Sequence, residues 1–286
     1  MPALEARPRP SRLDPVSPEA LFVLSAVAQY VGAVIAVNLF DEVRPATVAW
    51  LRVVGACLAL AIASWRHRGH RWTRPEVVAA AVFGIATAAM NLFFYLGIAR
   101  LDLGPSVAIE FIGPITVAAV RTRTRRNAVA LTLAVIGVTV LSGLSLDGEP
   151  LGLLFIFLAS AMWALYIVVG SRVAGFDRGL SGLALGLGIG ALAIAPVGIP
   201  GSGPVWRSPS LLAACLVVGV FSNAIGYGID QHVMRRMTVR RFALMLAVLP
   251  VTALAMGAVA LDQTPSPAEL AGVVLILAGL IVQDRT

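Results

Sequence analysis

The hydrophobic residues of this chain come in continuous blocks of about 20, the length at which one α-helix crosses the ~30 Å hydrocarbon layer of a bilayer. The blocks do not alternate apolar and polar positions as the strands of a transmembrane barrel do. The pattern therefore predicts an all-α membrane protein.

Arg clusters, Pro and Gly divide the chain into ten predicted transmembrane helices. They cover residues 20–40, 46–65, 76–98, 104–121, 127–144, 151–171, 180–199, 210–230, 241–261 and 267–283. Residues 1–19 are Pro-rich and of mixed charge, and we expect them to form a disordered cytoplasmic tail.

The positive charges are distributed unequally between the predicted connections. All 22 basic residues are Arg, and with a cytoplasmic N-terminus 18 of them lie on the cytoplasmic side. The opposite side has only Arg44, Arg100 and Arg207, and Arg52 lies inside the second helix. Because cytoplasmic loops are enriched in basic residues, both termini are predicted to be cytoplasmic in a multi-pass protein of the cell (inner) membrane.

Composition agrees with this class. The chain is 58% hydrophobic and 13% charged, whereas soluble domains carry about 25% charged residues, so a soluble enzyme is excluded. The net charge of +7 resides in short connections between apolar blocks, which membrane topology explains better than a nucleic-acid partner does. Contact of the Arg pairs with anionic lipids is a secondary expectation.

The ten helices divide into two sets of five at the Arg-free connector Ser145–Pro150. Because five is odd, residues 151–283 would enter the membrane in the opposite sense to residues 20–144, which predicts an inverted repeat. Two echoes support it: Asn91-x-x-x-Tyr95 recurs as Asn223-x-x-x-Tyr227, and Pro114 recurs as Pro250. Coincidence in an apolar chain of low complexity is the alternative.

Two ionisable residues stand at bilayer depth, where a charge costs at least ~2.5 kcal/mol. Glu110 and Arg52 each lie six residues from the outer end of their helices, at about 9 Å depth, and are expected to pair. Arg52 has an alternative, because an arginine at this depth can snorkel to the headgroups. Glu110 is too short to snorkel, which favours a functional role over a purely structural ion pair.

Polar and aromatic residues at comparable depth are candidates for a substrate site, because buried hydrogen-bonding groups and rings need partners. Trp163 and Tyr166 share one helix face, and core packing is the alternative for both. The substrate-binding candidates are Gln29, Asn91, Tyr95, Glu110, Trp163, Tyr166, Asn223 and Tyr227.

Two prolines are expected to break helices. Pro114 has no amide to donate to the carbonyl of Glu110, and Pro250 has none for Leu246. Broken helices at membrane depth tend to line cavities, although a simple packing kink is the alternative.

Two further features have simpler interpretations. Asp230 lies near Arg235 and Arg236 and is interpreted as a solvated or paired charge at the membrane boundary. Gly182, Gly186 and Gly190 form a stripe of small residues that favours close helix packing.

Signals for enzymatic chemistry are missing from the sequence. The chain has neither a GxxxxGK[ST] loop nor an HExxH motif, and its two cysteines lie inside apolar blocks. The sequence also places no Ser or Asp nucleophile beside a base at membrane depth. We expect neither catalysis nor a cofactor nor a bound metal.

The sequence resembles EamA-domain members of the drug/metabolite transporter superfamily, and specifically their threonine and homoserine exporter branch. Residues 89–96 (AMNLFFYL), 103–114 (LGPSVAIEFIGP) and 162–167 (MWALYI) carry the resemblance, with Arg172 beyond them. It implies two inverted five-helix EamA repeats, a central cavity, and proton-driven export of amino acids or related metabolites. By matching position, the family's Glu-and-Pro element falls on Glu110 and Pro114.

The second half departs from this pattern. The resemblance leads us to expect a Glu before Pro250, where Leu249 stands, and another at Gln263. These losses put in doubt a mechanism with one carboxylate in each half and concentrate attention on Glu110.

These features favour a secondary active exporter of small polar metabolites, most of all amino acids such as threonine or homoserine. Alternating access and coupling to protons through Glu110 are expected. An exporter of drugs or organic cations is an alternative, because a carboxylate among aromatic rings suits a cation. A non-transporting membrane scaffold or assembly subunit is the alternative from another class.

Overall fold

The computed structural model describes residues 15–65, 72–121, 124–141, 149–174, 179–236, 246 and 248–282, and over these ranges it contains helices and no strands. The helices are α1 (Pro18–Leu39), α2 (Pro45–Ala63), α3 (Arg74–Ile98), α4 (Leu103–Glu110), α5 (Ile112–Arg121), α6 (Arg125–Leu141), α7 (Pro150–Ala174), α8 (Gly179–Gly198), α9 (Gly203–Arg207), α10 (Pro209–Gly219), the π-helix η2 (Val220–Tyr227), α11 (Gly228–Arg236), α13 (Val248–Ala260) and α14 (Pro267–Val282). The all-α prediction is confirmed.

Each of the ten predicted ranges overlaps at least one described helix, although the fourth range covers α4 and α5, and the eighth covers α10, η2 and the start of α11. Six segments of the described chain are long and apolar enough to cross a membrane. They are Pro18–Leu39, Pro45–Ala63, Arg74–Ile98, Pro150–Gly170, Leu180–Gly198 and Pro209–Asp230. The chain is therefore a multi-pass membrane protein. The tail over 1–14, the connector over 145–148 and the start of the ninth range over 241–245 lie outside the described residues.

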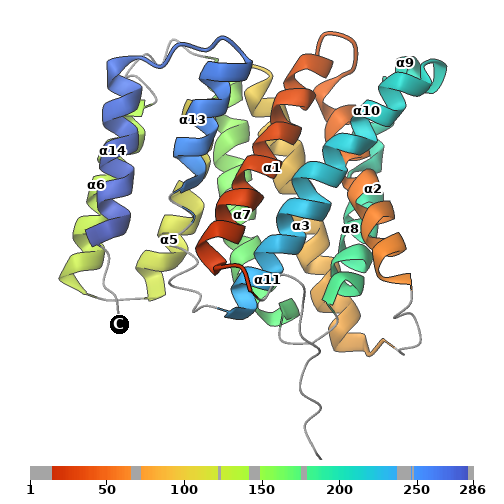
Figure 1. Cartoon of the computed structure of the whole chain (residues 1–286), viewed down its shortest axis with the longest axis horizontal. Helices are drawn as coiled ribbons and strands as arrows, with labels where there is room; N and C mark the ends of the chain where they lie inside the picture. The colour runs from red at the N-terminus through yellow and green to blue at the C-terminus, as the bar shows by residue number, and fades with distance from the viewer. Residues whose placement is uncertain are drawn as a thin grey trace, which may run out of the picture.

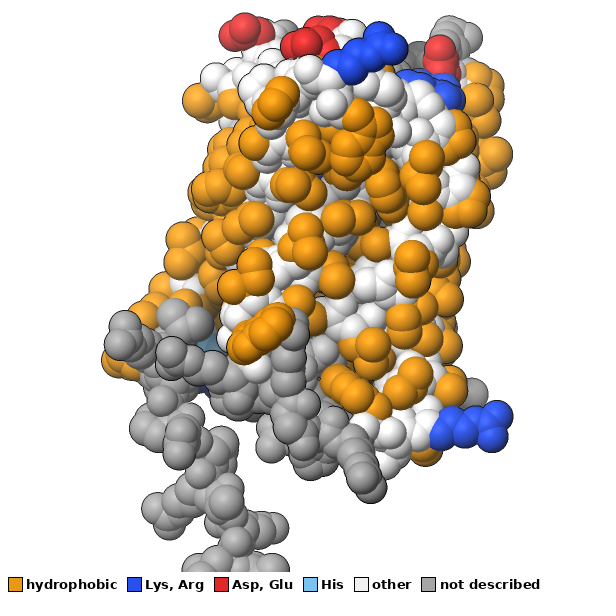
Figure 2. All heavy atoms as spheres, turned by 90° about the vertical axis from the view of Figure 1, so that its right-hand side faces the viewer, with side chains coloured by type: hydrophobic (Ala, Val, Ile, Leu, Met, Phe, Trp, Pro, Cys, Tyr) orange, Lys and Arg blue, Asp and Glu red, His pale blue; other side chains and the backbone are white. Residues whose placement is uncertain are grey.

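The long helices run side by side, and the start of α1 and the end of α14 lie at the same end of the bundle (Figure 1). Figure 2 shows hydrophobic side chains covering the face between the two ends, with charged side chains at the ends. Large apolar side chains of the described helices are well exposed, for example Ile62 at 73% and Leu192 at 76%. Such a surface suits hydrocarbon and not water.

Glycines allow α3 and α8 to pack with their backbones in contact. A Cβ atom added to Gly84 would fall on the carbonyl oxygen of Gly186, and one added to Gly190 would fall on the carbonyl oxygen of Gly84. The close packing predicted from Gly186 and Gly190 is confirmed. Glycines also join α2 to α10, since a Cβ on Gly219 would meet the carbonyl oxygen of Arg52.

The helix is interrupted between α4 and α5, at Phe111. Pro114, four residues after Glu110, has no amide hydrogen to continue the helical bonding there. Pro250 has the same place in α13 as Pro114 has in α5, because each is the third residue of its helix and lies in the first turn. The carbonyl of Leu246 accepts a 2.9 Å hydrogen bond from the amide of Leu249, so the expectation that Pro250 deprives Leu246 of a donor was wrong.

Candidate functional site

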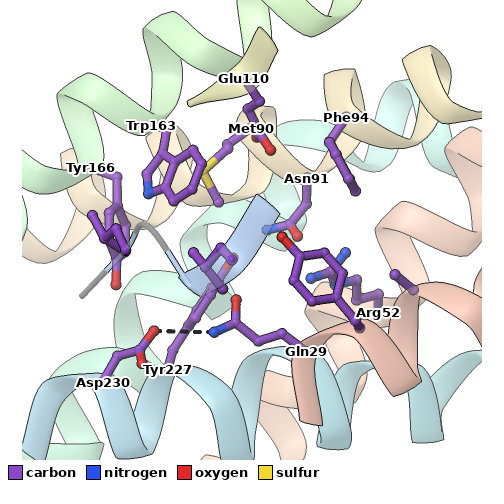
Figure 3. A pocket seen from close by; sticks show the side chains of 14 residues that line it. Gln29, Arg52, Met90, Asn91, Phe94, Glu110, Trp163, Tyr166, Tyr227 and Asp230 are labelled. Atoms are coloured by element: carbon purple, nitrogen blue, oxygen red, sulfur yellow. Dashed lines mark hydrogen bonds between the residues drawn. The ribbon is translucent and has the colours of Figure 1, made fainter. Parts of the chain in front are cut away.

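A pocket opens inside the bundle and is lined by residues from both halves of the chain (Figure 3). It contains about 650 Å³ of space between atoms, a volume that includes the part open to solvent. The lining residues are Gln29, Tyr30, Ala33, Arg52, Met90, Asn91, Phe94, Glu110, Trp163, Tyr166, Tyr227, Asp230, Leu246 and Leu249.

Most of the residues singled out from the sequence come together in this pocket. Those that line it are Gln29, Arg52, Asn91, Glu110, Trp163, Tyr166 and Tyr227. Tyr95 and Asn223 do not line it, but both contact Arg52. Pro114 is buried beside the break that follows Glu110.

Arg52 projects into the bundle and is only 5% exposed. Its Nε donates a 2.6 Å hydrogen bond to Oδ1 of Asn223, and its Cζ lies 4.8 Å from the ring centroid of Tyr95. The snorkelling alternative was therefore wrong. A direct ion pair with Glu110 is also not formed, because the salt bridge within the described residues joins Arg100 to Glu149.

Arg52 contacts one residue from each copy of the repeated Asn-x-x-x-Tyr motif. From the first copy, Tyr95 packs against the guanidinium and Asn91 lines the pocket. From the second copy, Asn223 bonds the guanidinium and Tyr227 lines the pocket. The two copies of the motif thus meet around the guanidinium of Arg52, which contacts the Tyr of the first copy and the Asn of the second.

Asp230 is the main functional candidate that the sequence interpretation misplaced. It is 5% exposed and lines the pocket. Oδ1 accepts a 2.6 Å hydrogen bond from Ser25 Oγ, and Oδ2 accepts a 3.3 Å bond from Gln29 Nε2 (Figure 3). Its interpretation as a boundary charge was wrong, and Arg236 instead donates to the carbonyl of Val16. The partner expected for Gln29 is found here.

Aromatic rings form a further part of the wall. Trp163 packs edge-on against Phe111, which directly follows Glu110, with ring centroids 5.7 Å apart. Tyr166 lies between Phe83, at 5.0 Å, and Tyr227, at 5.7 Å. Trp163 and Tyr166 therefore both line the pocket and pack against other buried rings.

The two positions at which the family resemblance predicts a Glu that this chain lacks have different surroundings. Leu249 is 3% exposed and lines the pocket, so a hydrophobic side chain occupies that part of the wall. Gln263 lies away from the pocket, and its Oε1 accepts a 3.3 Å bond from the amide of Leu103 at the start of α4. The second half nevertheless supplies a buried carboxyl group, Asp230, from another helix.

Several apolar lining residues were not identified from the sequence. Helical spacing offered a signal for some of them, because Ala33 follows Gln29 by four residues and Phe94 follows Asn91 by three, which puts each pair on one face. Tyr30, Met90 and Leu246 had no comparable signal. The described residues contain no group of three His, Cys, Asp or Glu side chains able to hold a metal ion.

Comparison with known proteins identifies relatives of this chain. The model of the EamA-like transporter family matches residues 150–283. The threonine/homoserine exporter RhtA of Escherichia coli (strain K12) is 32% identical over 250 residues, which cover 86% of this chain and 84% of RhtA. RhtA of Salmonella typhimurium (strain SL1344) is 31% identical over the same lengths.

Two further proteins are similar to this chain. A probable amino-acid metabolite efflux pump of Salmonella typhimurium (strain LT2) is 26% identical over 171 residues, covering 55% of this chain and 57% of the pump. A solved crystal structure shares the fold with a TM-score of 0.64 and 20% identity, covering 95% of this chain and 96% of the other. Because it is 32% identical to RhtA over most of both chains, the protein belongs to the EamA-like transporter family.

Proposed function

We propose that the protein is a secondary active exporter of small polar metabolites, most of all amino acids such as threonine or homoserine, in the inner membrane. The observation that carries this proposal is the pocket, in which Arg52, Glu110 and Asp230 place both signs of charge among aromatic rings. An amino acid carries an ammonium and a carboxylate group, so such a pocket suits it. The relatives described as threonine/homoserine exporters support the same substrate class.

Ten transmembrane helices in two inverted repeats, 20–144 and 151–283, form the proposed architecture. When the halves are matched in order, α7 corresponds to α1, and α3 corresponds to the helix built from α10, η2 and α11. The packing follows this correspondence, because α3 packs on α7 as η2 and α10 pack on α1, and α3 packs on α8 as α10 packs on α2. Glycines make close contacts in both α3–α8 and α2–α10. These matched contacts support alternating access by the two halves around the pocket.

Protons are the proposed coupling ion, with Glu110 as the carrier. Its side chain faces the pocket, and within the described chain it receives no hydrogen bond from another side chain. A carboxyl group in this position can bind a proton when the pocket opens outward and release it when the pocket opens to the cytoplasm. The helix break at Phe111 directly follows it, where a change in backbone geometry would alter its surroundings.

Inside-out membrane vesicles containing the full chain test this function. With an acidic lumen, labelled L-threonine is expected to accumulate with saturable kinetics, and dissipating the pH gradient should stop accumulation. Vesicles from cells without the protein are the control. Uptake indistinguishable from this control for L-threonine and L-homoserine would contradict the proposal and favour a non-transporting scaffold.

Export of organic cations is a second candidate, favoured by two carboxyl groups beside Trp163, Tyr166 and Tyr227. The buried Arg52 argues against it, because a cation would be repelled by the guanidinium. Labelled tetraphenylphosphonium in the same vesicles separates the two functions. Accumulation of this cation without accumulation of amino acids would support the second candidate.

A further inference from the structure

Asp230 presents a fixed carboxyl group to the pocket. Ser25 and Gln29 of α1 both donate to it, and the Gln29 amide also donates to Ser25 Oγ at 3.0 Å. Both carboxyl oxygens of Asp230 therefore accept hydrogen bonds from α1, which fixes the orientation of the carboxyl group. Glu110, in contrast, has no such network among the described residues, so the two carboxyl groups of the pocket are held differently.

Arg52 presents a fixed cation to the same pocket. Its Nε is committed to Asn223, and its guanidinium packs on Tyr95, which restricts how the group can turn. A guanidinium has five N–H donors, so the terminal nitrogens retain donors for an anion. No carboxylate of the described chain lies within salt-bridge distance of Arg52, although the residue is 5% exposed.

The two groups belong to one pocket and are linked to one helical run. Asn223, which bonds Arg52, lies in η2, and Asp230 follows it by seven residues, in α11. Arg52 and Asp230 both line the pocket. An α-amino acid carries an ammonium group and a carboxylate group on the same carbon atom, so it presents one group of each charge to such a pocket.

We propose that Asp230 binds the ammonium group of the substrate and Arg52 binds its carboxylate, so that the pocket selects zwitterionic α-amino acids. This inference rests on the proposed transport function and deepens it. Glu110 is required by neither contact and remains available for the proton. Ser25, Gln29 and Asn223 are positioning residues, since they act through Asp230 and Arg52.

Binding measurements on the purified full chain test this assignment with three matched probes. L-homoserine carries both charged groups, 4-hydroxybutyrate lacks the ammonium group, and 3-aminopropan-1-ol lacks the carboxylate. Dissociation constants come from the ligand-induced rise in melting temperature in detergent. Asp230→Asn is expected to weaken L-homoserine and 3-aminopropan-1-ol by about tenfold, or 1.4 kcal/mol, and to leave 4-hydroxybutyrate unchanged. Arg52→Gln should weaken L-homoserine and 4-hydroxybutyrate and spare 3-aminopropan-1-ol.

Ser25→Ala keeps the Asp230 carboxyl group and removes one of its donors. It is expected to weaken the two ammonium-bearing probes by a smaller factor than Asp230→Asn, and it provides the test if Asp230→Asn does not fold. Glu149→Gln, at an exposed position outside the pocket, is the matched control and should bind all three probes as the wild type does.

The outcomes separate the two proposals. If the wild type transports L-homoserine but Asp230→Asn, or Ser25→Ala in its place, affects 4-hydroxybutyrate as much as L-homoserine, the subsite assignment is overturned and the exporter function stands. Unchanged affinity of these variants for L-homoserine also overturns the assignment. If the wild type neither binds nor transports an amino acid, the exporter function itself fails.

Discussion

The 2.6 Å hydrogen bond from Arg52 Nε to Asn223 Oδ1 joins α2 to η2 beside the pocket. Both side chains are buried, at 5% and 0% exposure, so the bond lies where water is excluded. Asn223 belongs to a π-helix, a geometry that occurs often at functional sites. The bond fixes the pocket's cation to a helix that also carries Tyr227.

Removing Asn223 should therefore destabilise the protein. Asn223→Ala is expected to cost about 1–3 kcal/mol, because the buried guanidinium loses its hydrogen-bond partner. The double change Arg52→Leu/Asn223→Leu should destabilise the protein by less than the sum of the effects of Arg52→Leu and Asn223→Leu measured singly, since no lone charge remains in the double variant. Unfolding midpoints in detergent measure both effects.

Asn38→Leu is the control for this experiment, because exposed Asn38 donates only within its own helix, to the carbonyl of Val34. It should change the midpoint little. Additive effects of the Arg52 and Asn223 changes would show that the bond does not contribute to stability.

Glu110→Gln is expected to abolish uphill, gradient-driven accumulation of L-threonine while exchange of labelled for unlabelled L-threonine continues. The amide keeps the size of the side chain but cannot carry the proton. Inside-out vesicles report accumulation, and vesicles preloaded with L-threonine report exchange. Glu149→Gln, whose side chain pairs with Arg100 at the surface, should leave both rates unchanged. A Glu110→Gln protein that still accumulates L-threonine, with the wild-type response to a collapsed gradient, would show that Glu110 is not the coupling residue.

Sequence alone predicted the helices well, because long apolar blocks have one stable form in a bilayer. It also identified most polar residues of the pocket, since a buried Asn, Gln or Glu must have a partner. Asp230 was misinterpreted for a physical reason. Counting along the helix gave its closeness to Arg235 and Arg236, but its partners Ser25 and Gln29 are about 200 residues away in sequence.

The prediction that Arg52 pairs with Glu110 was wrong for a related reason. Equal depth places two residues at one level of the membrane, but it does not determine which helix faces are adjacent. The structure turns Arg52 toward Asn223 and Tyr95, and Glu110 lies across the pocket (Figure 3). Pro250 shows a similar limit, because the sequence does not reveal that the carbonyl of Leu246 accepts a hydrogen bond from another donor, the amide of Leu249.

A methyl group at Gly84 should disrupt the bundle. Gly84→Ala places a Cβ on the carbonyl oxygen of Gly186, where backbone cannot yield easily. Overpacking of this kind costs about 1–3 kcal/mol, which lowers the melting temperature and the yield of monodisperse protein. Gly203→Ala is the control, since a Cβ there meets nothing within 4 Å. Equal melting temperatures for the two variants would contradict the close contact of α3 with α8.

The proposed topology predicts the side of each connection. Reporter fusions after Pro150 and Pro204 should lie outside, and fusions after Arg74, Arg126 and Arg241 should lie in the cytoplasm, as the positive-inside rule requires. A reporter active only in the periplasm, fused in parallel with one active only in the cytoplasm, distinguishes the sides. A cytoplasmic result at Pro150 would contradict the inverted repeat, because both halves would then enter the membrane from the same side.

Pro114→Ala should impair transport more than it impairs folding. Alanine restores an amide that can donate to the carbonyl of Glu110, so α4 and α5 are expected to join into one regular helix across Phe111. A regular helix would turn Glu110 relative to Trp163, which packs against Phe111. Melting temperature should therefore stay near the wild-type value or rise, while L-threonine accumulation falls. Pro196→Ala removes a proline inside α8 at an exposed position outside the pocket and should leave accumulation unchanged. Full transport by Pro114→Ala would show that the break at Phe111 serves only packing, and equal losses for both proline variants would indicate a general requirement for kinked helices instead of a role at Glu110.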